Sequence, residues 1–217
     1  SLADRGRLDA ASLVVANGGG LEGGLEDTLA ATPTPIHSIV GNAADPHIWL
    51  DPISVAEALP ALASALIDHA GLNPADIEAC RLDLDARLRS LDEDVQGLLS
   101  TIPASRRSFV TDHAMLGRFA DRYHLGVFGT VLESHSSMAE PSAHDLEALA
   151  EEMSEQGVAV IAIEEAGHDD DSRRLAERTG ATIVEIPLRL GPEGSPTGTY
   201  EGMLRILAER LDDALRG

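Results

Sequence analysis

The sequence predicts an α/β protein with two lobes, each built on a parallel sheet flanked by helices, joined by one long rigid helix. In the second half of the chain, short apolar segments alternate with amphipathic ones, as parallel strands alternate with covering helices. Between residues 73 and 100, an apolar stripe continues for about 26 residues, or roughly 39 Å of helix. That is longer than a small domain is wide. We therefore expect an N-terminal lobe over 1–72, a connecting helix over 73–100 and a C-terminal α/β lobe over 101–217.

The first 72 residues predict two short strands and three helices. The apolar run 13–16 leads into Asn17 and three glycines, as expected of a strand followed by a loop that needs a permissive backbone. The second strand is expected over 36–40, and the helices over 2–11, 21–29 and 52–69. Because Pro60 lies inside the third helix, we expect a kink or two consecutive helices there.

The predicted connecting helix begins at Asn73 and Pro74 and ends before Pro103. Its apolar positions step by three or four residues and form one stripe: Ile77, Cys80, Leu84, Leu88, Leu91, Val95 and Leu98. Because Cys80 belongs to this stripe, we expect a buried, unreactive thiol. Beyond this helix, strands are expected over 108–111, 126–131, 158–163 and 181–186, with helices over 114–124, from 142, over 171–179 and over 199–215.

Composition and charge exclude several classes of function. The formal net charge is −21, which argues against binding to nucleic acid or to an anionic membrane surface. No uninterrupted run of eighteen apolar residues exists, so direct membrane insertion is not expected. One cysteine rules out an internal disulfide, and the start at Ser1 instead of Met suggests a processed or trimmed chain. The sequence contains no nucleophile elbow, phosphate loop or His-Glu-x-x-His motif, so we do not expect an enzyme.

The stretch Asp-Pro-His-Ile-Trp-Leu-Asp-Pro at 45–52 is the first candidate site. Pro46 fixes the backbone before His47, and Asp51 followed by Pro52 predicts the N-cap and first position of a helix. A histidine between a rigid turn and a helix start suits a ligand whose geometry must not drift. The competing interpretation is a helix entry in which the histidine only packs.

Polar residues also follow three strands of the C-terminal lobe, and ligands of parallel sheets bind beyond the carboxyl ends of the strands. His113 follows the first of these strands, with a helix expected at once behind it. Together with His47 it supplies two imidazoles from two lobes, and imidazole and carboxylate ligands suit zinc, manganese or iron. A metallohydrolase built on Glu164 and His113 is a weaker alternative. The remaining histidines considered are interpreted as structural or surface residues: His37, His69, His124, His135 and His144.

Several motifs occur in a characteristic order along the whole chain. They are Asn-Gly-Gly-Gly-Leu-Glu (17–22), Asp-Pro-His-Ile-Trp-Leu-Asp-Pro (45–52), Phe-Val-Thr-Asp-His-Ala (109–114), Ala-Glu-Pro-Ser (139–142), Leu-Gly-Pro-Glu-Gly-Ser-Pro (190–196) and Thr-Tyr-Glu-Gly-Met-Leu (199–204). Together they resemble the solute-binding proteins of zinc and manganese ABC transporters, the ZnuA/TroA-like family. The resemblance implies an extracytoplasmic protein, in the periplasm or at the cell surface. Such a protein captures Zn²⁺, or secondarily Mn²⁺, in the cleft between two lobes and delivers it to an ABC permease in the membrane.

Carried over by this resemblance, His47 and His113 match two family ligands. Glu164 matches an acidic position beside the site, as a substitute ligand or a residue that supports the ligands. We favour Glu164 over the loop residue His135 for a further coordination position, and we expect a metal or His113 to satisfy its carboxylate. The chain departs from the family at Leu188, where an acidic ligand is usual.

The family's first ligand histidine would lie before the segment matching residues 1–4, so the N-terminal lobe is expected to be incomplete. Its sheet would then present an open edge at Leu13–Ala16, which suggests self-association through that edge. The missing histidine and Leu188 also leave a second hypothesis. It is a non-transporting relative with a degenerate metal site, acting as a binding or assembly module.

Overall fold

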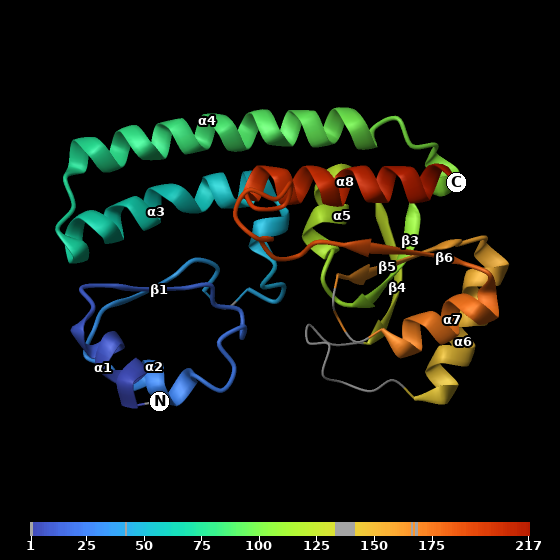
Figure 1. Ribbon diagram of the computed structural model, residues 1–217, viewed down its shortest axis with the longest axis horizontal. Helices are drawn as coiled ribbons and strands as arrows, with labels where there is room; N and C mark the ends of the chain where they lie inside the picture. The colour runs from blue at the N-terminus through green and yellow to red at the C-terminus, as the bar shows by residue number, and fades with distance from the viewer. Residues whose placement is uncertain (1, 42, 133–141, 166, 168) are drawn as a thin grey trace. The chain divides into compact units, whose positions relative to one another are not determined.

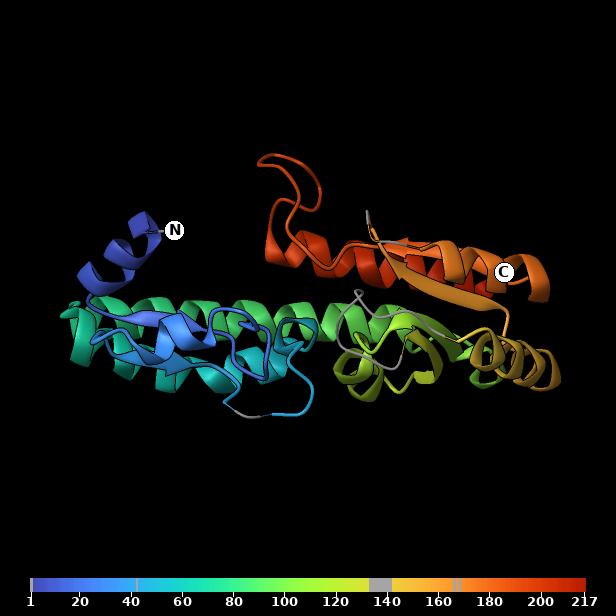
Figure 2. The ribbon, with the colours of Figure 1, turned by 90° about the horizontal axis from the view of Figure 1, so that it is seen from below.

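A computed structural model describes the chain except for residues 1, 42, 133–141, 166 and 168 (Figures 1 and 2). The described chain is an α/β protein whose strands form parallel sheets flanked by helices, as predicted. It divides into two compact units, residues 1–90 and 91–217. The division falls inside one helix, α4 (Pro74–Leu99), so this helix contributes residues to both units. The sequence suggests instead a separate connecting segment over 73–100.

The first unit contains a two-stranded parallel sheet, in which Val14 lies opposite Ile36. Its elements before α4 are α1 (Leu2–Ala10), β1 (Val14–Ala16), α2 (Glu26–Ala30), β2 (Ile36–Ser38), the 3₁₀ turn η1 (Ile48–Leu50) and α3 (Pro52–Ala70). Helix α2 is shorter than the helix expected over 21–29. The reason is local, because Gly24 has a φ of +84° and residues 19–25 form turns.

Helix α3 begins and ends as its sequence predicts. The side chain of Asp51 accepts a hydrogen bond from the backbone N–H of Ile53 at 3.0 Å, and Pro52 is the first helical residue. Gly71 ends the helix in the left-handed conformation, with a φ of +65°. Of the two alternatives expected at Pro60, two consecutive helices are not found, because helix α3 is continuous through Pro60. The kink stays a prediction.

Among the described helices, α3 alone meets the length and composition of a membrane span, with a mean hydropathy of 1.2 over eighteen residues. Only 22% of that stretch is buried in the structure. One such helix is weak support for a membrane span, since helices of soluble proteins meet the same criteria. The absence of direct membrane insertion therefore stays a prediction.

The apolar stripe of α4 is buried in only one part of the helix. Leu88, Leu91 and Val95 are at most 2% exposed, whereas Ile77 and Leu84 are only partly buried. Cys80 is a free and exposed cysteine, so the prediction of a buried thiol is wrong. The three- and four-residue spacing of the apolar residues in α4 identifies one face of the helix. The spacing does not determine whether another element covers that face.

The second unit holds a four-stranded sheet in the order β4-β3-β5-β6, with every pair of neighbours parallel. Its elements after α4 are η2 (Ala104–Arg106), β3 (Ser108–His113), α5 (Gly117–Tyr123), β4 (Gly126–Leu132), α6 (Ala143–Gln156), β5 (Val160–Glu164), α7 (Asp170–Thr179), β6 (Thr182–Ile186) and α8 (Tyr200–Arg216). Helix α5 begins only at Gly117, so the expectation that a helix follows His113 at once is wrong.

Alternate residues of the strands pack on the two faces of this sheet. Val110, Ile161 and Ile163 form one core cluster with Met153 of α6 and Leu175 of α7. Helix α8 packs along β5 and β6, and Figure 1 places it across the sheet from α6 and α7. Helices therefore cover the faces of the sheet, and the carboxyl ends of its strands lie at one edge of the unit.

Candidate metal centre

His47 ends a rigid turn in the first unit and is almost completely buried, with 3% of its surface exposed. Asp45 holds it through one carboxylate oxygen. Oδ1 accepts a hydrogen bond from the His47 backbone N–H at 3.0 Å and lies 2.9 Å from Nδ1 of the ring. The imidazole meets Trp49 edge to face, with ring centroids 5.2 Å apart. With Nδ1 engaged by a carboxylate, Nε2 is the nitrogen that this arrangement presents to a metal ion.

The loop after β1 supports the turn that carries His47. Asn17 donates a side-chain hydrogen bond to the backbone oxygen of Pro46 at 2.9 Å. The carboxylate of Glu22 accepts from the backbone N–H groups of Asn17 and Gly18, at 2.7 and 3.0 Å. Gly19 has a φ of +63°, and a Cβ added there would lie 2.9 Å from Cβ of Pro46. The Asn-Gly-Gly-Gly-Leu-Glu motif therefore fixes the position of the turn, a role that sequence reasoning did not assign to it.

His113 is the last residue of β3 in the second unit and is 4% exposed. Its backbone N–H donates to Asp112 Oδ1 at 2.8 Å, and its Nδ1 lies 2.9 Å from the same oxygen. The other oxygen of Asp112 accepts a hydrogen bond from the backbone N–H of Glu164 at 3.1 Å. The approach of Nδ1 to Oδ1 does not have hydrogen-bond geometry, so this buried carboxylate is a close neighbour of the ring. Through its hydrogen bonds to two backbone N–H groups, Asp112 joins the ends of β3 and β5.

Glu164 ends β5, and its carboxylate is paired with an arginine. Oε1 accepts from both Nε and Nη2 of Arg189, at 2.8 and 2.6 Å. The side chain of Glu164 is 12% exposed and that of Arg189 is 77% exposed. In the structure Arg189 therefore pairs with this carboxylate, where the sequence suggests a metal ion or His113. The assignment of Glu164 as a metal ligand stays a prediction. Leu188, just before Arg189, is 7% exposed and offers no donor atom to a metal.

The described residues contain no cluster of three or more His, Cys, Asp or Glu side chains that could hold a metal ion. His47 belongs to the first unit, and His113 and Glu164 belong to the second. His144 is exposed, in line with its interpretation as a surface residue. His69, interpreted from the sequence as structural, is exposed near the end of α3, and His37 lies on β2. His135 lies outside the described residues.

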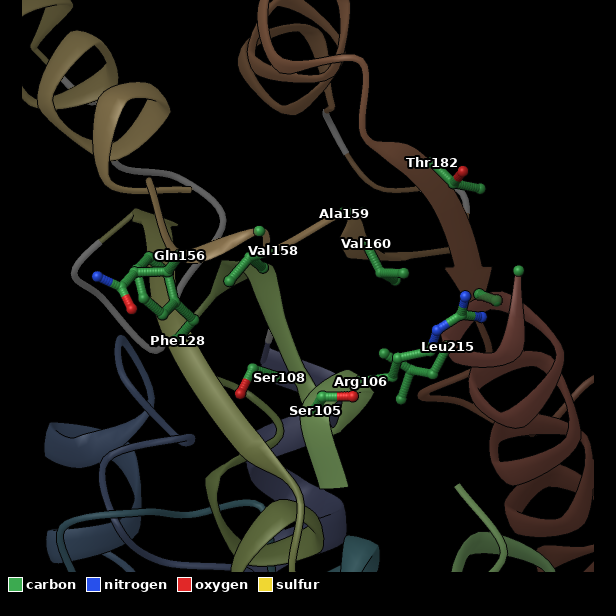
Figure 3. A pocket seen from close by; sticks show the side chains of 13 residues that line it. Ser105, Arg106, Ser108, Phe128, Gln156, Val158, Ala159, Val160, Thr182 and Leu215 are labelled. Atoms are coloured by element: carbon green, nitrogen blue, oxygen red, sulfur yellow. The ribbon is translucent and has the colours of Figure 1, made fainter. Parts of the chain in front are cut away.

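The second unit also has a cavity of about 420 Å³ at the amino ends of the strands, whereas His113 lies at the carboxyl end of β3. Ser108, Val160 and Thr182, the first residues of three strands, contribute to its lining together with Phe128 and Leu215 (Figure 3). Among the described residues that line it, Arg106 alone is charged. Because it lies at the amino ends of the strands, this cavity is separate from the polar residues at their carboxyl ends.

Comparison with known proteins finds a matching family along nearly the whole chain. The model of the family described as "ZnuA: Zinc-uptake complex component A periplasmic" matches residues 1–214. The high-affinity zinc uptake system protein ZnuA of Paracoccus denitrificans is 30% identical over 175 residues, which are 79% of this chain. The zinc-binding protein TroA of Treponema pallidum is 29% identical over 167 residues, or 74% of this chain. The matched stretches span about half of these relatives, 52% and 54% of their lengths.

Solved structures show the same fold. The periplasmic zinc-binding protein TroA from Treponema pallidum superposes with a TM-score of 0.86 at 22% identity, over 99% of this chain and 84% of that one. The manganese-bound periplasmic metal-binding protein from Candidatus Liberibacter asiaticus gives a TM-score of 0.83 at 18% identity, over 99% of this chain and 85% of that one. These likenesses confirm the predicted fold class. Since the family model covers nearly all of the sequence, the chain belongs to the ZnuA family of periplasmic zinc-uptake components.

Proposed function

We propose that this protein captures Zn²⁺, or secondarily Mn²⁺, and delivers it to an ABC permease in the membrane. The observation that carries the proposal is a buried imidazole placed beside an aspartate in each of the two units. His47 and His113 are each at most 4% exposed, and each has Nδ1 within 2.9 Å of an aspartate oxygen. A carboxylate beside Nδ1 is usual for histidines that bind metal, and at His47 the contact is a hydrogen bond. By the resemblance of their sequence motifs, both residues also match ligand positions of the ZnuA/TroA-like family.

The proposed ligands are His47, His113 and Glu164. Two imidazoles and one carboxylate form a donor set that suits zinc and is compatible with manganese. As a member of a periplasmic family, the protein is extracytoplasmic. The family is one of transport components and not of enzymes, so the metallohydrolase hypothesis finds no support in it.

Metal titration tests this function. We expect calorimetry of the metal-free chain with Zn²⁺ to show a saturable heat, which a His47→Ala and His113→Ala double variant loses. A double variant of the exposed residues His69 and His144 is the matched control, because it removes the same two imidazoles from exposed surface and should bind as the original chain does. Equal heats from the original chain and the His47/His113 variant would refute the proposal. Equal heats would instead favour the second hypothesis, a non-transporting relative with a degenerate metal site.

A further inference from the structure

The ion pair between Arg189 and Glu164 places a fixed positive charge on a proposed metal ligand. Both hydrogen bonds from the guanidinium, at 2.6 and 2.8 Å, end on the same oxygen, Oε1. This geometry leaves Oε2 as the oxygen through which a cation would approach the carboxylate. Arginine keeps its proton throughout the accessible pH range, so its charge is a permanent feature of the pair.

The charge balance of the proposed ligands depends on this arginine. Neutral imidazoles contribute no charge, and Glu164 is the only anion among the three proposed ligands. Arg189 cancels that charge, and its guanidinium would also repel a divalent cation bound at Oε2. Leu188, directly before Arg189, is apolar and adds no negative charge. Residues 188 and 189 therefore supply a positive charge at a place where a negative charge would strengthen metal binding.

We propose that Arg189 is a determinant of metal affinity that weakens binding at Glu164 and so favours release of the metal. The inference rests on the proposed function. Metal capture requires the carboxylate to be shared with the guanidinium or taken from it. The side chain of Arg189 is 77% exposed, so it can leave the pair for solvent with little loss of packing. Release is assisted when the guanidinium returns to Oε1.

Competition titration of the metal-free full chain with Zn²⁺ and a coloured chelator measures this effect. We expect Arg189→Gln to bind Zn²⁺ about three- to tenfold more tightly, from removal of the ion pair and of the repulsion. The gain should shrink when the ionic strength rises from about 0.1 to about 1 M, because the Debye length falls from about 10 to about 3 Å. A purely structural role for Arg189 would not give this salt dependence.

Arg173→Gln is the matched control. Arg173 also lies in the second unit, pairs with Asp169 at 2.5 Å and Glu185 at 3.2 Å, and is half exposed. Its substitution changes the net charge by the same single unit. We expect no gain in affinity from it. In a Glu164→Gln background, Arg189→Gln should likewise give no gain, because the effect acts through that carboxylate.

Two results would overturn the inference. One is an unchanged affinity of Arg189→Gln, and the other is an equal gain in the Glu164→Gln background. If the original chain binds Zn²⁺ through His47 and His113 while Arg189→Gln has no effect, the inference fails and the proposed function stands. If neither the original chain nor Arg189→Gln competes with the chelator for Zn²⁺, the proposed function and the inference fail together.

Discussion

At the scale of single residues, two aspartates at different spacings produce the same contact. Asp45 lies two positions before His47 and Asp112 lies one position before His113, yet each carboxylate oxygen is 2.9 Å from an imidazole Nδ1. In both cases the same oxygen also accepts the backbone N–H of the histidine. At His47 the ring and the main chain are thus hydrogen-bonded to one group, which limits the rotation of the imidazole and presents Nε2 in a fixed direction. At His113 the hydrogen bond is made by the main chain, and the ring approaches the same oxygen without hydrogen-bond geometry.

Gly19 provides the sharpest test of the loop that supports His47. We expect Gly19→Ala to destabilise the chain by about 1–2 kcal/mol for its positive φ, with a further loss because the new Cβ would lie 2.9 Å from Cβ of Pro46. Urea unfolding followed by the fluorescence of Trp49 measures both effects.

Gly20→Ala is the matched control for this prediction. Gly20 has a φ of +86°, but nothing lies within 4 Å of a Cβ added there. The two variants therefore share the backbone strain and differ in the contact with Pro46. Equal losses of stability would show that the close approach of Gly19 to Pro46 has no energetic weight.

Sequence reasoning selected His47 and His113 as candidate ligands because each stands beside a local signal, a proline-bounded turn or a strand end. The partner of Glu164 could not be predicted in this way. Arg189 is 25 residues further along the chain, and pairing between the end of a strand and a later loop follows no sequence period. The link from Asn17 to Pro46 was missed for the same reason.

At the scale of elements, helix boundaries were predicted well where a cap fixes them. Ser142 accepts a hydrogen bond from Asp145 N at 3.2 Å at the start of α6, and Gly180 ends α7 with a φ of +73°. These signals are local in sequence, so they can be read without the tertiary structure. The burial of α4 and the exposure of Cys80 depend on which elements cover the helix, and its periodicity carries no such information.

The N-cap of α3 leads to a prediction about stability. We expect Asp51→Ala to lower the free energy of unfolding by about 1 kcal/mol, because the backbone N–H of Ile53 loses its acceptor. Ser54, whose hydroxyl donates to Asp51 at 2.5 Å, loses its partner as well. Chemical denaturation measures the change. Asp68→Ala, at an exposed position near the end of the same helix, removes the same charge and should cost less than half as much.

At the scale of the whole molecule, the alternation of strands and helices was sufficient to predict the α/β class and the parallel sheet of the second unit. The division into units was harder to place. The described chain divides between Ser90 and Leu91, inside a helix that is regular on both sides. The backbone N–H of each helical residue i bonds to the C=O of residue i−4, whichever elements pack against the helix. No composition shift therefore marks the point where its neighbours change.

The sheet of the first unit suggests that two copies of the chain associate. Among the described residues, β1 and β2 pair only with each other, and Val15 and Ile36 are 47% and 42% exposed. Open strand edges with apolar side chains are templates for pairing. We expect sedimentation equilibrium to show a dimer whose fraction rises with concentration, and Val15→Lys to reduce that fraction.

Leu190→Lys is the control, because Leu190 is 60% exposed but belongs to the second unit. It introduces the same positive charge on an exposed apolar residue and should leave the dimer fraction unchanged. A chain that remains monomeric at every concentration, or an equal response of the two variants, would contradict association through β1 and β2.

The exposed thiol of α4 has a practical consequence for spectroscopy. Cys80 is the only cysteine in the sequence, and all sixteen basic residues are arginine, so lysine amines offer no competing nucleophile. A maleimide fluorophore can therefore be attached at one defined position without any substitution. With Trp49 as the only tryptophan, the first unit then carries one donor and one acceptor for energy transfer. The natural sequence thus supplies a built-in reporter of the conformation of the first unit.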